Sequence, residues 1–143
     1  MPILRLILAI VLGLVVGSVV NMAIVMLGSV VIPPPPGADM TTPEGIRAAF
    51  PLLGPGHYIF PFLAHALGTL VGAFLAAKVA SQYTLTAAVI VGIFFLVGGI
   101  VATGMIPAPV WFIAVDLSCA YLPVAWIGYK LARPRTQAPV LAG

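Results

Sequence analysis

Four long apolar stretches constrain the fold of this chain more than any other feature of its sequence. They cover about residues 3–32, 58–78, 84–106 and 109–131. About 20 apolar residues in a helix span the roughly 30 Å hydrocarbon core of a bilayer. Lipid offers no hydrogen-bond partner to the backbone, so spanning segments are helical unless they alternate apolar and polar residues as a barrel does. Because that alternation is absent, we predict an all-α integral membrane four-helix bundle, with residues 1–143 forming a single transmembrane domain.

Composition excludes the other common classes of protein. Of the 143 residues, 62% are hydrophobic and 6% are charged, whereas about 25% are charged in a soluble domain. This difference excludes a soluble enzyme and a disordered regulator. The net charge of +3 rests on six Lys and Arg, which are too few for a nucleic-acid surface. We therefore expect the lipid bilayer, and no nucleic acid, as a partner.

The positions of the basic residues predict an orientation in the membrane. If four helices alternate in direction, five of the six basic residues fall on one side, and these are Arg5, Lys78, Lys130, Arg133 and Arg135. Only Arg47 falls on the other side. Lys and Arg are enriched in cytoplasmic loops. We therefore predict that both termini are cytoplasmic and that segments 33–57 and 107–109 lie outside.

The outer segment 33–57 contains signals for one short helix. Residues 33–36 are all proline and end the first long helix. Thr42 is a suitable N-cap, Pro43 suits the first helical position, and Glu44 places an acid in the first turn. We expect a short helix here that lies on the outer membrane surface with its apolar face down.

Small residues mark the faces on which the long helices are expected to pack. Gly13 and Gly17 have the GxxxG spacing that lets two membrane helices approach closely, and Gly68 and Gly72 repeat it in the second stretch. Pro123 lies inside the fourth stretch and is predicted to kink it.

Four polar residues within the apolar stretches are candidates for a pocket: Asn21, His65, Thr69 and Asp116. At about 1.5 Å of rise per residue, His65 and Asp116 both lie roughly 10 Å below the outer ends of their helices. An ionisable residue inside a membrane is a functional-site hypothesis by default. The alternative is a hydrogen bond between Asp116 and His65 that only fixes the order of the helices.

Asp39, Glu44 and His57 are expected at the outer mouth of this pocket. Their side chains are of types that bind cations or metals, although their spacing matches no known metal motif. The alternative for His57 is an anchor at the membrane interface. No motif for a nucleophile or a catalytic metal occurs, so we assign no catalytic residue, no metal ligand and no cofactor.

Three segments resemble a family of small bacterial membrane proteins with four transmembrane helices. They are Gly17-Ser-Val-Val-Asn-Met22, the run Pro33–Pro36 followed by Gly37 and Asp39, and the block from His57 to Gly72. The resemblance extends over about the whole chain. It implies a protein of the bacterial inner membrane, and it implies no particular activity.

Two functions follow from these observations. In the first, an outward-facing intramembrane pocket handles a proton, a cation or a small solute, and the protein works as a homodimer. In the second, the chain is an accessory or assembly subunit without chemistry, which packs on another membrane subunit through its glycine faces.

Overall fold

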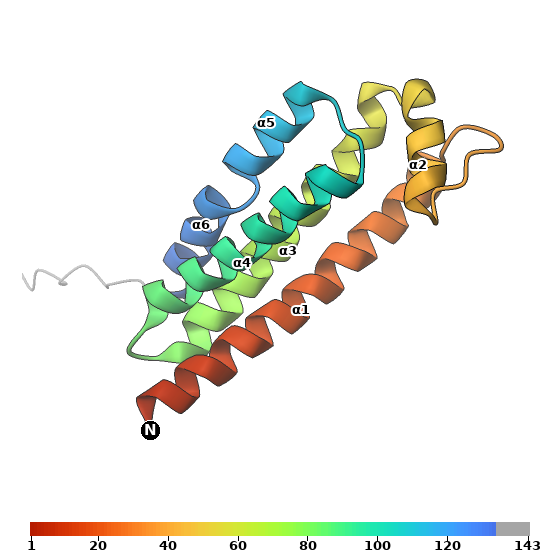
Figure 1. Cartoon of the computed structure of the whole chain (residues 1–143). Coiled ribbons are helices and arrows are strands. Elements are labelled where there is room, and N and C mark those ends of the chain that lie inside the picture. Colours follow the sequence, from red (N-terminus) through yellow and green to blue (C-terminus); the bar gives the residue numbers. More distant parts are fainter. Residues whose placement is uncertain (134–143) are drawn as a thin grey trace, which may run out of the picture.

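The computed structural model describes residues 1–133, and its regular structure in that range is entirely helical (Figure 1). The long helices are α1 (Pro2–Val31), α3 (Ile59–Ala80) and α4 (Thr84–Met105), and two shorter ones, α5 (Val110–Cys119) and α6 (Leu122–Ala132), follow each other in line. Four segments of the described range are long and apolar enough to cross a membrane: Pro2–Val31, Pro55–Ala80, Thr84–Met105 and Val110–Ala132. The predicted all-α bundle of four spans is confirmed. The chain is a multi-pass membrane protein whose helices contact lipid.

Helix α3 lies at the centre of the bundle and contacts α1, α4 and α6 (Figure 1). Its contact with α1 is made by two facing GxxxG motifs. A Cβ atom added at Gly13 would lie 2.5 Å from the carbonyl oxygen of Gly72, and one added at Gly68 would lie 2.8 Å from that of Gly17. Side chains larger than hydrogen at these positions would therefore hold the two backbones apart. The packing role predicted for these glycines is confirmed.

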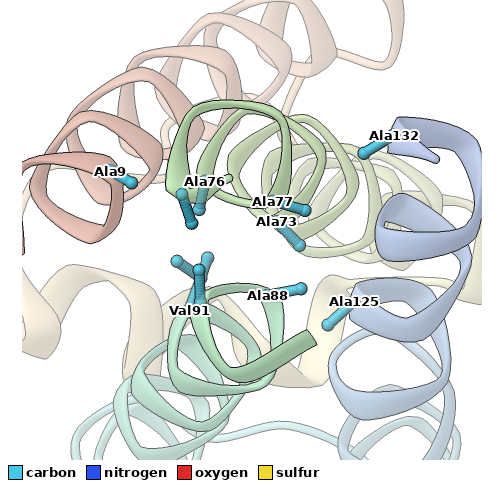
Figure 2. Packing of buried hydrophobic residues seen from close by; sticks show 10 residues of the cluster. Ala9, Ala73, Ala76, Ala77, Ala88, Val91, Ala125 and Ala132 are labelled. Atoms are coloured by element: carbon cyan, nitrogen blue, oxygen red, sulfur yellow. The ribbon is translucent and has the colours of Figure 1, made fainter. Parts of the chain in front are cut away.

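The end of the bundle that carries the N-terminus and the turn at residues 81–83, which we call the turn end, is packed with very small side chains. Figure 2 shows alanines of α1, α3, α4 and α6, with Val91 of α4, lying between these helices where they face one another. Alanine brings the helices close together and leaves no polar group in the space between them. The buried members of this cluster are Ala9, Ala73, Ala76, Ala77, Ala80, Ala87, Ala88, Val91, Ala125 and Ala132.

The fourth span is broken near its middle. Helix α5 ends at Cys119 and α6 begins at Leu122, with Pro123 in the first turn of α6. Proline has no N–H to donate and clashes with the preceding turn, so the helix is interrupted there. The kink predicted at Pro123 is confirmed, and it takes the form of a break at which Tyr121 leaves helical geometry, whereas Ala120 keeps helical backbone angles.

The opposite end of the bundle, which we call the loop end, carries residues 33–57. Helix α2 (Pro43–Ala49) forms there as predicted, and the amide N–H of Gly45 donates to Thr42 Oγ1 at 3.1 Å. Its position on the membrane surface stays a prediction. Two 3₁₀ turns, Phe50–Leu52 and Pro55–Tyr58, connect α2 to α3.

Three basic side chains bind the C-terminal turns of helices. Arg5 Nε donates to the carbonyl oxygen of Val79 at 2.6 Å, and Lys78 Nζ donates to that of Ala132 at 3.4 Å. At the loop end, Arg47 Nη2 donates to the carbonyl oxygen of Met105 at 3.2 Å. The last carbonyls of a helix lack backbone partners and attract positive charge. Arg47, the one basic residue predicted outside, therefore has a structural role. Arg135 lies outside the described residues.

We expect Gly13→Ala to destabilise the bundle by about 1–3 kcal/mol, the usual cost of overpacking a close contact. The added methyl group would meet the backbone of α3. The matched control is Gly98→Ala on α4, because a Cβ there meets nothing within 4 Å. Unfolding of both variants in detergent micelles measures the difference, and equal stabilities would contradict the proposed importance of the α1–α3 contact.

Candidate functional site

A cavity of about 550 Å³ opens between α1, α3, α4 and α5 at the loop end, and we call it the chamber. Ligand pockets in proteins fall in the range of about 300–1,000 Å³ and are mostly apolar with a few polar groups. The chamber has this character. Its apolar walls include Val25, Ile32, Phe60, Ala102, Ile106 and Ile113.

His65 and Asp116 lie at the deep end of the chamber, farther from the loop end than the other lining residues of their helices. His65 Nδ1 lies 2.9 Å from Asp116 Oδ1 and 3.0 Å from Asp116 Oδ2. The hydroxyl of Tyr121 donates to Asp116 Oδ2 at 2.9 Å. We call these three residues the polar cluster. The carboxylate is thus bound by two donors from two different segments of the chain.

The two ionisable members of the polar cluster differ in their exposure. The Asp116 side chain is 6% exposed, whereas that of His65 is 28% exposed. A carboxylate can only accept hydrogen bonds, so Nδ1 of His65 carries the proton in this contact. Nε2 makes no hydrogen bond to another residue in the described range. A neutral His65 therefore presents an acceptor to the chamber, and a protonated one presents a donor.

Tyr121 reaches Asp116 because of the helix break and because α4 leaves space for it. Tyr121 is fully buried and its ring stacks on that of His65, with 5.7 Å between the centroids. A Cβ added at Gly99 of α4 would overlap the Tyr121 hydroxyl. Sequence analysis missed Tyr121. The available signal was a tyrosine close to Pro123 in an apolar helix, where its hydroxyl needs a partner.

The other two residues predicted for the pocket lie elsewhere. Asn21 is half-buried on α1, and it packs against Gly68 of α3 rather than lining the chamber. Thr69 is fully buried one turn beyond His65, and its hydroxyl has no hydrogen-bond partner among the described residues. The structure therefore brings His65 and Asp116 together and leaves Asn21 and Thr69 outside the chamber wall.

Of the residues predicted at the mouth, His57 lines the chamber, and its Nδ1 accepts from the amide N–H of Gly54 at 3.1 Å. Asp39 accepts from the Thr41 hydroxyl and amide and from the Thr42 hydroxyl. Glu44 lies in the first turn of α2. Within residues 1–133, no three His, Cys, Asp or Glu side chains gather as a metal site. Asp39 and His57 are each bound within their own turns, and the role of these residues at the mouth stays a prediction.

The chamber has a simple electrostatic character. Its lining contains the ionisable residues His57, Tyr58, His65 and Asp116, and no Lys or Arg among the residues that the structure describes. With neutral His65, the polar cluster carries one negative charge. The interaction of this charge with a ligand is strengthened by the low dielectric of the apolar walls.

Comparison of the chain with protein families, with curated proteins and with solved structures gave no match. The fold itself defines a multi-pass membrane protein with four candidate spans. The bacterial family named from sequence resemblance is not identified by these comparisons.

We expect Tyr121→Phe to destabilise the protein by about 0.6 kcal/mol, the average for a hydrogen bond between membrane helices, and by no more than about 1.7 kcal/mol. The substitution removes only the hydroxyl that binds Asp116. Tyr83→Phe is the control, because Tyr83 is 41% exposed. Unfolding in micelles compares the two variants. A smaller loss for Tyr121→Phe than for Tyr83→Phe would contradict the role of this hydrogen bond.

The pKa of Asp39 is lowered by the Thr41 hydroxyl first, then by the Thr41 amide and the Thr42 hydroxyl. A lowered pKa means that the ionised form stabilises this loop above the unfolded pKa, and that the effect is lost as pH falls through the folded pKa. Carboxyl NMR should give a midpoint for Asp39 below the usual value of about 3.9. Thr41→Val should raise the midpoint, whereas Thr86→Val at the turn end should leave it unchanged.

Proposed function

We propose that this protein binds a small solute in the chamber from the outer side of the membrane and exchanges a proton with it at His65. The observation that carries the proposal is the contact of His65 with the buried Asp116 at the deep end of the chamber. Asp116 holds the imidazole in one orientation, and the other ring nitrogen is free to accept or donate a proton. An imidazole can accept or donate a proton at a ring nitrogen, which suits His65 to this exchange.

The direction of access is supported by the distribution of basic residues. The chamber opens at the loop end, which the excess of Lys and Arg at the turn end predicts to be outside. With the sequence resemblance, this supports a location in the bacterial inner membrane with both termini in the cytoplasm.

Binding from one side is favoured over continuous conduction by the packing beyond the polar cluster. There the helices are in contact through glycine backbones and the alanine cluster (Figure 2). A path to the turn end would require α1 and α3 to separate. We therefore propose a binding protein or a carrier rather than an open channel.

The rival function, an accessory subunit that packs through glycine faces, is less well supported. The glycines expected to form those faces contact other helices of the same chain, and they include Gly13, Gly17, Gly68, Gly72, Gly92 and Gly99. These glycines already pack within the chain, so they do not form a free surface for a partner. A homodimer formed through other apolar surfaces stays a prediction.

Access to His65 can be tested in a variant with a single histidine. The chain contains two histidines, so His57→Gln leaves His65 as the only imidazole for ¹⁵N NMR in vesicles. With the internal pH held constant, we expect its signals to respond to changes of the external pH in molecules whose loop end faces out. An Ala38→Cys label read with an impermeant maleimide, in a Cys119→Ser background, measures the fraction of such molecules.

Two results would contradict the proposal. In the first, the His65 signals ignore the pH on the side of the loop end. In the second, vesicles with the wild-type protein leak protons faster than vesicles with Asp116→Asn, which would indicate a channel through the bundle.

A further inference from the structure

We infer that the ligand of the chamber is an amphipathic organic amine, bound as an ammonium ion that donates an N–H to Nε2 of His65. This inference rests on the proposed function, and it adds the chemical class of the solute. Three properties of the chamber lead to it: the charge of its lining, the free ring nitrogen and the apolar walls.

The charge of the lining selects a cation over an anion. Asp116 is the one carboxylate among the described lining residues, and none of them is Lys or Arg. Arg47, the basic residue of segment 33–57, is engaged with the carbonyl of Met105. A negative charge in an apolar cavity attracts an ammonium ion strongly and repels a carboxylate or phosphate.

The hydrogen bonds of the polar cluster decide which atom receives the ligand. The Asp116 oxygens already accept from His65 and from Tyr121. Because the Asp116 side chain is only 6% exposed whereas that of His65 is 28% exposed, a donor in the chamber meets Nε2 of His65. A primary or secondary ammonium group can donate to this nitrogen, whereas a quaternary ammonium group cannot. The charge of Asp116 acts on the ligand through the imidazole that it orients.

The walls require an apolar body on the ligand. They present aliphatic side chains together with the rings of Tyr58, Phe60 and Phe112. Aromatic faces attract a cation that lies near them, which adds to the preference for an ammonium ion. A volume of about 550 Å³ fits a body larger than a bare metal ion.

Binding of this ligand depends on the protonation of His65. When the imidazole is protonated, Nε2 becomes a donor, and the positive ring cancels the charge of Asp116. The affinity for an ammonium ion is therefore expected to be lower when His65 is protonated than when it is neutral. An ammonium ion that enters a chamber with protonated His65 displaces one proton, which conserves the charge of the site.

Octylamine, octyltrimethylammonium and octanol test the inference, because the three compounds have the same alkyl chain and differ only in the head group. Equilibrium binding of each is measured on the wild-type protein in nanodiscs of zwitterionic lipid, with empty nanodiscs subtracted. We expect saturable binding of octylamine, and binding of the other two that is weaker by about tenfold or more, as for the loss of one charged hydrogen bond. Asp116→Asn should weaken octylamine binding by a similar factor.

Two further variants distinguish a specific loss of octylamine binding from a loss of the folded structure. Ser118→Ala changes an exposed side chain two residues from Asp116 and should bind octylamine like the wild type. Ala102→Phe places a large ring in the chamber wall while leaving the residues of the polar cluster unchanged, and it should abolish binding. Unfolding curves show whether each variant is folded, and if Asp116→Asn is not, Ala102→Phe decides whether octylamine binds in the chamber.

The inference is overturned if octanol or octyltrimethylammonium binds the wild type as tightly as octylamine. It is equally overturned if a folded Asp116→Asn or Ala102→Phe variant retains full affinity for octylamine. If His65 follows the external pH while octylamine fails to bind, only the ligand class is wrong. If His65 does not respond to the external pH, the proposed function fails as well.

Discussion

The contact between α1 and α3 is the interaction on which the rest of the structure depends. Gly13 and Gly17 face Gly72 and Gly68 at backbone distance, so the two longest spans of the described chain lie against each other. Lipid supplies no hydrophobic force that drives helices together, and close backbone packing replaces it. With α1 held on one side of α3, and α4 with the broken fourth span on the other, the chamber at the loop end is bounded by all four spans.

The polar cluster shows how the break between α5 and α6 supports a buried carboxylate. An aspartate near the centre of a membrane helix costs about 2.5–3.5 kcal/mol, and Asp116 offsets this by accepting from His65 and Tyr121. Tyr121 lies between α5 and α6, where Pro123 interrupts the span. The interruption at Pro123 therefore breaks the helix and also allows Tyr121 to donate a hydrogen bond to the carboxylate. Gly99 completes the arrangement by leaving room for the tyrosine ring.

Most of the fold was predictable because membrane helices obey local rules. Length and apolarity define the spans, Thr42 and Pro43 define the start of α2, and Pro123 defines the break. The candidate site was predictable only in part. His65 and Asp116 were selected by their chemistry and their depth, which depend on position along a helix. Tyr121 was missed, because its contact with Asp116 depends on a distortion of the backbone between them.

The sequence by itself determined four apolar spans, the short helix after the proline run, the glycine faces and the presence of one acid within a span. Each of these depends on residues close together in the chain, so local patterns suffice. The tertiary structure decided that Asn21 packs against Gly68, that Asp39 and His57 are bound in their own turns, and that His65 meets the chamber. These outcomes depend on the rotation of each helix about its axis and on the neighbour it faces. Both are set by close packing between helices far apart in the sequence, and hydropathy does not record them.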